Sequence, residues 1–385
     1  MGFKQNLIPT TAYNRLTRLP PLGSLASHHT LVKAITYTQN GDPTEVLKLR
    51  EFTLGPPKAN QLGLKFRLST LNPADINTIQ GRYPWKPAIR KDLIEDQEFY
   101  VSGNEGLAEV TSLGSELDPK QWKIGDWVIM GKPQLGTWQS HTNLGEQDVI
   151  KIPRSERLSE TQAATMSVNM STAYRMINDY LPQPSSSSGT WIIQNGANSS
   201  VGQYVLQLCK AWNLGCIGLI RDRPNVEELK AYLTRLGSED KTTILTYDEL
   251  ADRPKPSQSI SLGLNCVSGN AETVGMMRWM SNGSRLITYG GMSMKPLVVP
   301  TSLLIFRDLK LEGFMLTNWR MKASKSEYRE MLEDLVRLID RGHLLEHEHA
   351  TIVDLNSDLA EKTVRETVKQ SMSGRAGRKF LFRFI

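Results

Sequence analysis

Two glycines around one predicted strand–turn–helix unit have the type and spacing needed to bind a phosphorylated dinucleotide. An apolar strand that starts at Trp191 runs into a turn of small residues bounded by Gly196 and Gly202. Glycines at such a turn let the backbone approach a pyrophosphate at the positive end of the following helix. The middle glycine of the usual G-x-G-x-x-G/A pattern is replaced, so this spacing alone is weak evidence. The residues expected to hold the pyrophosphate are Asn198, Ser199, Ser200 and Val201.

The next strand ends in Arg221, Asp222 and Arg223. NAD enzymes place a carboxylate at this point to hold the ribose 2′-hydroxyl, whereas two guanidinium groups suit a 2′-phosphate. The pair Arg221 and Arg223 therefore favours NADPH as the cofactor. The alternative interpretation is a solvated strand end ahead of a helix capped by Asn225.

The elements that must position these residues fall into two kinds of segment. From residue 31 to about residue 164, short strands alternate with Gly, Pro and Asn turns, which indicates a β-rich module. From Trp191 onward, strands alternate with helices such as Val226–Leu236, and this alternation requires a parallel sheet. The final segment Lys379–Phe384 alternates as a strand that could close the sheet of the first module. With 385 residues and 39% hydrophobic content, the chain can bury two cores.

Charge and hydropathy narrow the functional classes. No apolar run approaches the ~18 residues of a membrane span, so we expect no membrane insertion. Four basic residues and no acidic residue precede Asp42, which favours a mitochondrial transit peptide over residues 1–30. The alternative is a disordered N-terminus with a chance charge bias. Removal of the three Lys and Arg residues within residues 1–28 lowers the net charge from +6 to +3. A net charge this small does not favour binding to nucleic acid.

The three cysteines, Cys209, Cys216 and Cys266, are widely spaced and odd in number. They match neither a disulfide framework nor a C-x-x-C metal knuckle, and a reducing compartment fits them best. The six histidines include no H-E-x-x-H spacing. We therefore predict no metal ligand and expect a side chain or the backbone to polarise the substrate.

Several short motifs occur together over residues 31–385. They are residues 71–84, Gly103-Asn-Glu-Gly106, Gly136-Thr-Trp138, Ile193-Gln-Asn195, Ile220-Arg-Asp-Arg-Pro224, Leu264-Asn-Cys-Val267 and Thr288-Tyr-Gly-Gly-Met-Ser293. In this combination the chain resembles the zinc-free medium-chain dehydrogenase/reductases, and among them the mitochondrial trans-2-enoyl thioester reductases. One departure is Ser268-Gly-Asn-Ala-Glu272, where related reductases usually have Gly-Gly-Lys-Ser-Ser.

The resemblance implies an α/β architecture with two domains. A GroES-like β-rich catalytic domain would comprise residues 31–165 and 311–385, and a Rossmann-type doubly wound parallel sheet would bind NADPH between them, over residues 166–310. The resemblance also implies a homodimer in the mitochondrial matrix that reduces enoyl thioesters of an acyl carrier protein in fatty acid synthesis. Cations between Arg307 and Lys325 would steer an acidic carrier protein, although a solvated helical surface explains the same charges.

The same resemblance assigns the catalytic role to Tyr83, in the Gly81-Arg-Tyr-Pro loop. A phenol with an ordinary pKa near ~10 stays protonated at matrix pH and can donate a hydrogen bond or a proton. Asn72 resembles a polar residue near the nicotinamide, although Asn before Pro is also a routine turn signal. Without the resemblance, a loop tyrosine would more often be interpreted as amphipathic packing.

The remaining site residues follow the strand ends or come from the resemblance. Tyr289, Gly290, Gly291 and Met292 follow a buried strand and are expected to line the nicotinamide side of the cleft. Trp138 could shape the acyl channel, although a buried Trp is more often plain core. Phe306, with Met292, is a candidate for the acyl pocket, and interdomain packing is the alternative.

Two other functions remain open from the sequence. A quinone reductase of the same fold would also lack zinc but would not need Tyr83. A catalytically silent relative that binds NADPH or nucleic acid is suggested only by the altered residues around Ser268.

Overall fold

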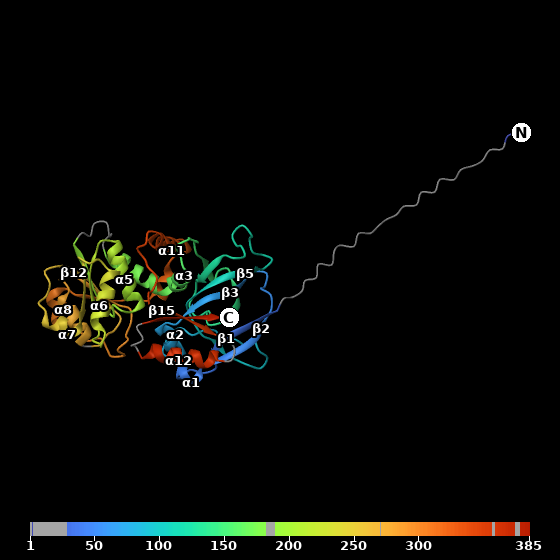
Figure 1. Cartoon of the computed structure of the whole chain (residues 1–385), viewed down its shortest axis with the longest axis horizontal. Helices are drawn as coiled ribbons and strands as arrows, with labels where there is room; N and C mark the ends of the chain where they lie inside the picture. The colour runs from blue at the N-terminus through green and yellow to red at the C-terminus, as the bar shows by residue number, and fades with distance from the viewer. Residues whose placement is uncertain (1, 3–28, 182–188, 270, 356–358, 374–377) are drawn as a thin grey trace.

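The computed structural model describes residue 2 and residues 29–181, 189–269, 271–355, 359–373 and 378–385, which form two lobes (Figure 1). The transit peptide predicted for residues 1–30 lies almost wholly outside the described residues, so it stays a prediction. No helix in the described part of the chain is long and apolar enough to cross a membrane.

One lobe is built on a six-stranded sheet in which every neighbouring pair is parallel, as the alternation of strands and helices predicted. The strand order is β11-β10-β9-β12-β13-β14, so the order reverses between β9 and β12. In such sheets, ligands bind outside the carboxyl ends of the strands at this reversal. The strands are β9 (Thr190–Asn195), β10 (Gly215–Ile220), β11 (Thr242–Thr246), β12 (Ser259–Asn265), β13 (Arg285–Thr288) and β14 (Lys310–Gly313).

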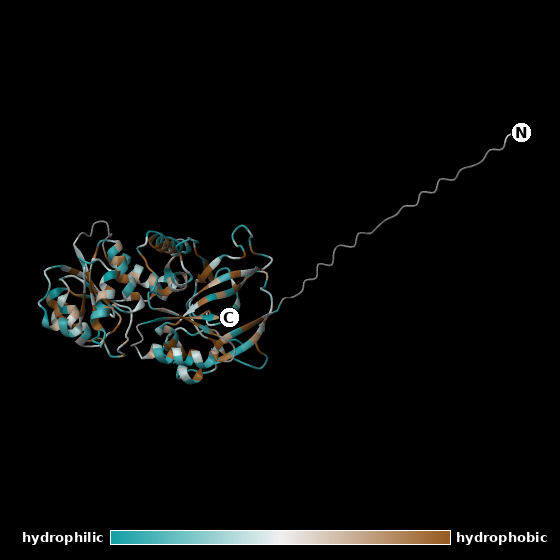
Figure 2. Cartoon of the chain, viewed as in Figure 1, coloured by the Kyte–Doolittle hydropathy of each residue, from teal (hydrophilic) through white to brown (hydrophobic). Residues whose placement is uncertain are grey.

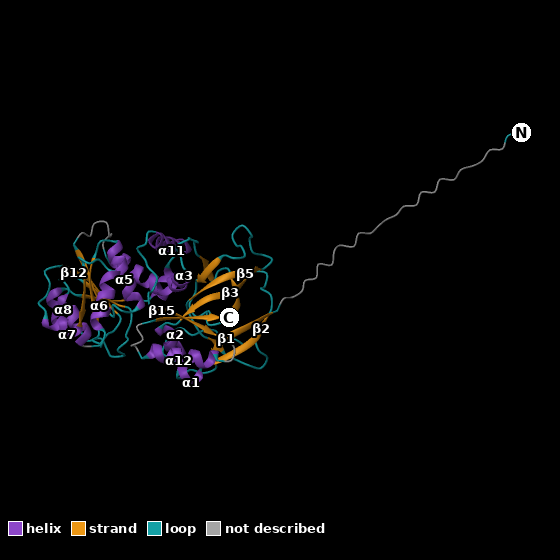
Figure 3. Ribbon diagram, viewed as in Figure 1, coloured by secondary structure: helices purple, strands orange, loops and turns teal. Residues whose placement is uncertain are grey.

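Helices cover both faces of this sheet, which makes it doubly wound (Figure 3). Successive residues of a strand point to opposite faces. Accordingly, Ile192 packs in a cluster with residues of α5 and α6, whereas Ile193 packs with residues of α7, α8 and α9. The helices are α5 (Ser200–Ala211), α6 (Val226–Leu236), α7 (Tyr247–Asp252), α8 (Ala271–Trp279) and α9 (Thr301–Arg307).

The other lobe contains a seven-stranded sheet and a three-stranded sheet. The final strand pairs antiparallel with β3, through Leu381 opposite Thr70, so it closes the sheet of the first module as predicted. The strands are β1 (Thr30–Tyr37), β2 (Lys48–Leu54), β3 (Gln61–Thr70), β4 (Tyr100–Val101), β5 (Gly106–Leu113), β6 (Trp127–Met130), β7 (His141–Gly145), β8 (Val149–Lys151), β15 (Ala350–Leu355) and β16 (Lys379–Phe384).

The remaining helices lie on the β-rich lobe or between the lobes. Long helices alternate hydrophilic and hydrophobic residues, so each buries one face (Figure 2). They are α1 (Pro43–Val46), α2 (Pro73–Ile79), α3 (Glu160–Thr165), the π-helical turn η1 (Met166–Met170), α4 (Ser171–Tyr180), α10 (Leu316–Lys322), α11 (Lys325–Asp340) and α12 (Ala360–Met372).

One hydrophobic cluster crosses from lobe to lobe. It contains Leu68 and Leu107 of the β-rich lobe, Met166 and Met170 of η1, and Ile192 of the parallel sheet. The segment α3–η1–α4 therefore belongs to a core that both sheets share. The domain boundary expected at residue 311 falls inside β14, which pairs with β13 in the parallel sheet. The division into domains stays a prediction.

Candidate active site

Tyr83 lies two residues after a tight turn at Gly81, just beyond α2. Gly81 has φ +74°, and a Cβ there would lie 3.1 Å from the Asn40 side chain, so a glycine suits this turn. The Asn40 side-chain nitrogen donates hydrogen bonds to the carbonyls of Thr78 and Ile79, at 3.1 and 3.0 Å. These contacts fix the C-terminal end of α2, and with it the start of the Tyr83 loop.

The Tyr83 loop contacts two segments that are distant in the sequence. Arg82 Nη1 lies 3.6 Å from Met294 Sδ, in the segment after β13. The Thr317 side chain, on α10, is close enough to the Tyr83 hydroxyl to lower its pKa. The predicted catalytic residue is therefore placed against elements that follow the parallel strands.

The surroundings of Tyr83 raise the pKa of its hydroxyl. The largest cause is burial, and the negative charge of Asp75 adds to it. The Thr317 hydroxyl and the positive charge of Arg320 act in the opposite direction. Tyr83 therefore stays protonated at neutral pH, in the form that can donate a proton.

Asn72, the N-cap of α2, is held in a buried polar network. Its side-chain nitrogen donates to Glu105 Oε2 at 2.8 Å and to the Thr70 hydroxyl at 2.9 Å. Its side-chain oxygen accepts from Lys379 Nζ at 2.6 Å and from Asn169 Nδ2 at 3.1 Å. Both donors and both acceptor sites of the amide are thus used within the protein. The role of Asn72 as a cofactor contact stays a prediction.

Glu105 is fully buried, and the π-helical turn η1 supplies partners for its carboxylate. The Val168 amide donates to Oε1 at 2.6 Å, and Asn169 Nδ2 donates to Oε2 at 3.0 Å. A π-helical turn widens the helix locally and often occurs at functional sites. Here it brings a backbone amide and a side-chain amide onto one buried carboxylate.

Asp75 and Lys379 add two more buried ionisable groups. Asp75 Oδ2 accepts from the Asn72 amide at 2.7 Å. Burial, as the largest cause, raises the pKa of Asp75 to about 7, while the Asn72 amide and the Lys379 charge oppose this shift. Burial also lowers the pKa of Lys379, against the attraction of Glu105 and Asp75.

The glycine turn after β9 has the close packing that a dinucleotide turn requires. A Cβ at Gly202 would lie 2.6 Å from the Gly196 carbonyl oxygen, and a Cβ at Gly196 would lie 2.5 Å from Cys266 Sγ. Ser199 is the N-cap of α5, and its hydroxyl accepts from the Gly202 amide at 3.1 Å. The first-turn amides of Ser200 and Val201 have no partner inside the helix. This turn therefore fits a pyrophosphate, although each predicted contact stays a prediction.

Polar contacts join the carboxyl ends of the central strands. Asn195 Nδ2 donates to Asn265 Oδ1 at 2.8 Å, and the Cys266 amide donates to Asn195 Oδ1 at 2.8 Å. The Met292 amide donates to the Cys266 carbonyl at 2.9 Å, which places the segment 289–292 beside the glycine turn. Burial raises the pKa of Tyr289, whose hydroxyl is close to Cys266.

Ser268, where the sequence departs from the usual family residues, also lies at the carboxyl ends of the central strands. Ser268 has φ +62°, and its amide donates to Asn265 Oδ1 at 2.9 Å. Its hydroxyl donates to the Gly290 carbonyl at 3.3 Å. Ser268 is thus held at this edge by hydrogen bonds of its backbone amide and its own hydroxyl.

Arg221 and Arg223 directly follow β10, at the same edge of the parallel sheet. The Tyr247 hydroxyl, after β11, is close enough to Arg221 for that charge to oppose the burial that raises the pKa of Tyr247. The pair therefore lies where the ribose end of a dinucleotide would be held. Its role in holding a 2′-phosphate stays a prediction.

The candidates for the substrate pocket lie in very different surroundings. Trp138 has no exposed surface, donates from Nε1 to the Thr70 carbonyl at 2.9 Å, and packs edge-on against Phe382. Met292 is 55% exposed and Phe306 is 77% exposed. An acyl chain could cover these two exposed side chains, so both assignments stay predictions, as does that of Trp138.

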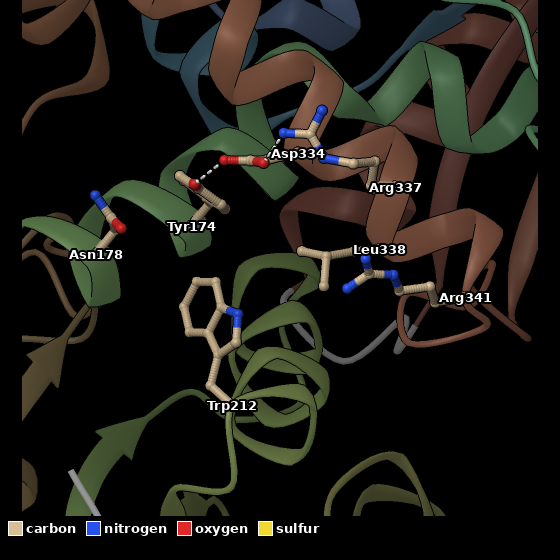
Figure 4. A pocket seen from close by; sticks show the side chains of 7 residues that line it. All are labelled: Tyr174, Asn178, Trp212, Asp334, Arg337, Leu338 and Arg341. Carbon is tan, nitrogen blue, oxygen red and sulfur yellow. Dashed lines mark hydrogen bonds and ion pairs between the residues drawn. The ribbon is translucent and has the colours of Figure 1, made fainter. Parts of the chain in front are cut away.

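A cavity of about 200 Å³ lies elsewhere, between α4, the end of α5 and α11 (Figure 4). On one wall the Tyr174 hydroxyl donates to Asp334 Oδ2 at 2.6 Å, and Arg337 pairs with the same carboxylate. None of the predicted site residues lines this cavity. Its lining residues are Tyr174, Asn178, Trp212, Asp334, Arg337, Leu338 and Arg341.

Four residues near the site were not assigned by the sequence. Glu105 stood in a motif without a role, and Arg320 was counted only among surface cations. No sequence pattern assigns Thr317 or Lys379 to the site, because the residues near them come from distant segments. For Glu105, the sequence gives one indication of burial. It is an acidic residue that stands among small and apolar residues, in Gly103-Asn-Glu-Gly106.

A β-rich lobe joined to a doubly wound parallel sheet, with a glycine turn at the strand reversal, defines the class of medium-chain dehydrogenase/reductases. No protein-family model matches the chain. The mitochondrial enoyl-[acyl-carrier-protein] reductase of Schizosaccharomyces pombe is 36% identical over 363 residues, which cover 91% of this chain and 94% of that protein. The chain belongs to the family of mitochondrial enoyl-[acyl-carrier-protein] reductases.

Solved structures agree with this family. A complex of Etr1p with NADP and crotonyl-CoA has a TM-score of 0.83 and 33% identity, and covers 92% of this chain and all of that chain. The mitochondrial 2-enoyl thioester reductase Etr1p/Etr2p heterodimer from Candida tropicalis has the same TM-score and coverage at 32% identity. The likeness extends over both lobes.

Proposed function

We propose that this protein uses NADPH to reduce trans-2-enoyl thioesters to saturated acyl thioesters. Family membership over nearly the whole chain supports this function. The observation that carries it is the placement of the protonated Tyr83 hydroxyl beside Thr317, on the helix that follows the parallel strands.

The reaction adds a hydride to C3 and a proton to C2 of the substrate. NADPH supplies the hydride when it is bound. Negative charge then grows on the thioester oxygen, and the Tyr83 hydroxyl serves as hydrogen-bond or proton donor to the resulting enolate. Asn72 and Glu105 hold α2, and therefore the start of the Tyr83 loop, in a fixed place.

The cofactor contacts follow the carboxyl edge of the parallel sheet. Backbone amides of residues 198–201 hold the pyrophosphate, and Arg221 and Arg223 hold the 2′-phosphate. Residues 289–292 line the nicotinamide side, since the Met292 amide is bonded to the loop beside the glycine turn. Close packing at Gly196 and Gly202 supports this arrangement.

The direct test is oxidation of NADPH by the purified protein, followed by absorbance, with crotonyl-CoA and with a quinone in parallel. We expect turnover with the enoyl thioester and little with the quinone. Turnover of the quinone alone would contradict the proposed function, and binding of NADPH without turnover of either would indicate a silent relative.

The in vivo substrate is proposed to be an enoyl thioester of acyl carrier protein. Lys322 and Lys325 are exposed at α10 and the start of α11, where they can attract an acidic carrier protein. Arg307 is less free to bind a carrier protein, because its guanidinium already donates hydrogen bonds to the carbonyls of Arg278 and Met280. Comparing kcat/KM for carrier-protein and CoA thioesters at low and high salt tests this partner.

A homodimer formed through the cofactor-domain sheet is also proposed. β14 is the edge strand of the parallel sheet, and Leu311 on it is 37% exposed. Ile305 on α9 is 68% exposed, so pairing of two such edges would cover apolar surface. Light scattering of the purified protein measures the mass directly.

The relatives are named mitochondrial, and the proposed compartment of this protein is the mitochondrial matrix. The acid-free basic leader supports import. Fractionation of mitochondria and N-terminal sequencing of the mature protein test both points, and we expect cleavage between about residues 19 and 32.

A further inference from the structure

Gln203, on α5, is hydrogen-bonded to the glycine turn and to two other segments. Its side chain is buried, and its Nε2 donates to the Asn198 carbonyl at 3.1 Å. Its Oε1 accepts from the Tyr232 hydroxyl at 3.0 Å and lies 3.0 Å from His347 Nδ1. A carboxamide oxygen only accepts hydrogen bonds, so Nδ1 carries the proton of the His347 ring. One buried amide thus binds the glycine turn, α6 and the segment ahead of β15.

The bond to the Asn198 carbonyl acts on the turn that fits a pyrophosphate. A peptide unit is planar, so fixing this carbonyl also fixes the Ser199 amide, which donates to the Gly196 carbonyl at 2.8 Å. Ser199 is the N-cap of α5, and the first-turn amides of Ser200 and Val201 follow it directly. The orientation of these amides therefore depends on the turn that Gln203 holds.

His347 belongs to the β-rich lobe, and Gln203 orients its ring. The His347 carbonyl accepts from the amide of Ala350, the first residue of β15, at 3.0 Å. The ring is buried and packs edge-on against Tyr204, with the ring centroids 4.8 Å apart. His347 Nε2 has no hydrogen-bond partner among the described residues, so the ring is oriented by the bond from Nδ1 to Gln203. Burial, as the largest cause, lowers the pKa of His347 to about 3, so the ring is neutral at neutral pH.

Gln207 offers a matched comparison one turn further along α5. It is also buried, and its Oε1 accepts from the Leu345 amide at 2.6 Å. Gln207 therefore binds the same segment of the β-rich lobe as Gln203 does. Within the described part of the chain, no side-chain hydrogen bond joins Gln207 to the glycine turn. The pair thus separates docking of the two lobes from support of the turn.

We propose that Gln203 is a positioning residue for NADPH, and that His347 of the β-rich lobe sets the cofactor affinity through it. This inference rests on the proposed function, in which backbone amides of residues 198–201 hold the pyrophosphate. Gln203 holds the Asn198 carbonyl, so that the amides at the start of α5 are preorganised for an anion. His347 and Tyr232 hold Gln203 in the orientation that presents Nε2 to Asn198.

The test measures the Kd for NADPH by fluorescence titration, with kcat and KM for crotonyl-CoA at saturating NADPH. Gln203→Met keeps the length of the side chain and removes its polar atoms. It should raise the Kd about tenfold, the scale of losing one hydrogen bond at a preorganised site. kcat and KM for crotonyl-CoA should stay within about twofold, because the turn serves the cofactor. Gln207→Met is the matched control and should leave the Kd within about twofold.

His347 is tested by a second pair of variants. His347→Leu removes one donor to Gln203 and should raise the Kd about threefold, since Tyr232 still holds Oε1. His347→Asn can place an amide donor near the position of Nδ1 and should restore most of the affinity. In a Gln203→Met background, His347→Leu should cause no further rise. If Gln203→Met does not fold, Tyr232→Phe combined with His347→Leu replaces it and should raise the Kd about tenfold, because both donors to Oε1 are then lost.

Three results would overturn the inference. An unchanged Kd in Gln203→Met would show that the turn does not need this bond. An equal rise in Gln207→Met would show that docking of the lobes, and not the Asn198 contact, sets the affinity. Rises that multiply in the double variant would show that His347 does not act through Gln203. Failure of the unmodified protein to bind NADPH would instead contradict the proposed function, which these three results leave intact.

Discussion

Lys379 Nζ lies 2.6 Å from the side-chain oxygen of Asn72, although Lys379 is only 6% exposed. This contact joins the first residue of the last strand to the N-cap of α2, 307 positions earlier in the chain. Glu105 and Asp75 are buried nearby and attract the same ammonium. The last strand thus supplies the cation that offsets the cost of burying these carboxylates.

We predict that Lys379→Met lowers the free energy of unfolding by about 3 kcal/mol at neutral pH, because removing one partner leaves buried carboxylates unpaired. Urea denaturation followed by circular dichroism measures this loss. Lys369→Met, at an exposed position of α12, is the control and should change stability by less than about 0.5 kcal/mol. A loss no larger than that of the control would show that the buried network does not depend on Lys379.

Asp75 should make stability depend on pH. Its pKa is about 7 in the folded protein, against an ordinary value of 3.8, so the folded state keeps a proton that the unfolded state releases. The free energy of unfolding should therefore fall as pH rises from about 4 to about 7.

Asp75→Asn removes this effect while keeping an acceptor for the Asn72 amide. The variant should match the unmodified protein near pH 4 and become more stable by about 4 kcal/mol well above pH 7, since each pKa unit corresponds to about 1.4 kcal/mol. Urea denaturation across this range measures the difference, with Asp252→Asn on α7 as an exposed control. A difference that does not grow with pH would contradict the raised pKa.

Arg221 and Arg223 should set the preference for NADPH over NADH. Each charged contact to the 2′-phosphate contributes about 1.5 to 3 kcal/mol, so replacing both with alanine should narrow the ratio of the two Kd values by about 10² or more. Fluorescence titration measures both constants, with the exposed Arg253→Ala as control. Equal affinities of the unmodified protein for the two cofactors would overturn the assignment.

Local pattern was enough to predict much of the fold. The helix Val226–Leu236 and the final strand Lys379–Phe384 have the bounds that the sequence predicts, because each is a regular hydrophobic pattern between clear breaks. The apolar residues from 311 to 316 predict a strand with those bounds, which is too late and too long. The structure has β14 at Lys310–Gly313, and α10 begins at Leu316.

The candidate site was less predictable because its contacts are not local. The glycine turn could be read from the sequence, since its residues are close together in the chain. The carboxylate of Glu105 instead takes partners from β3, α2 and η1, and no spacing in the sequence brings these segments together. Tyr83 was found only through resemblance, and the helix that carries Thr317 and Arg320 was not expected.

The role of Tyr83 is the central claim, and Tyr83→Phe tests it most directly. The variant keeps the ring, so packing is preserved while the hydroxyl is removed. We predict that kcat with crotonyl-CoA and NADPH falls by about 10² or more, the scale of losing a preorganised donor, while the Kd for NADPH stays nearly unchanged. Full turnover by Tyr83→Phe would contradict the account, because the proton would then come from water or another side chain.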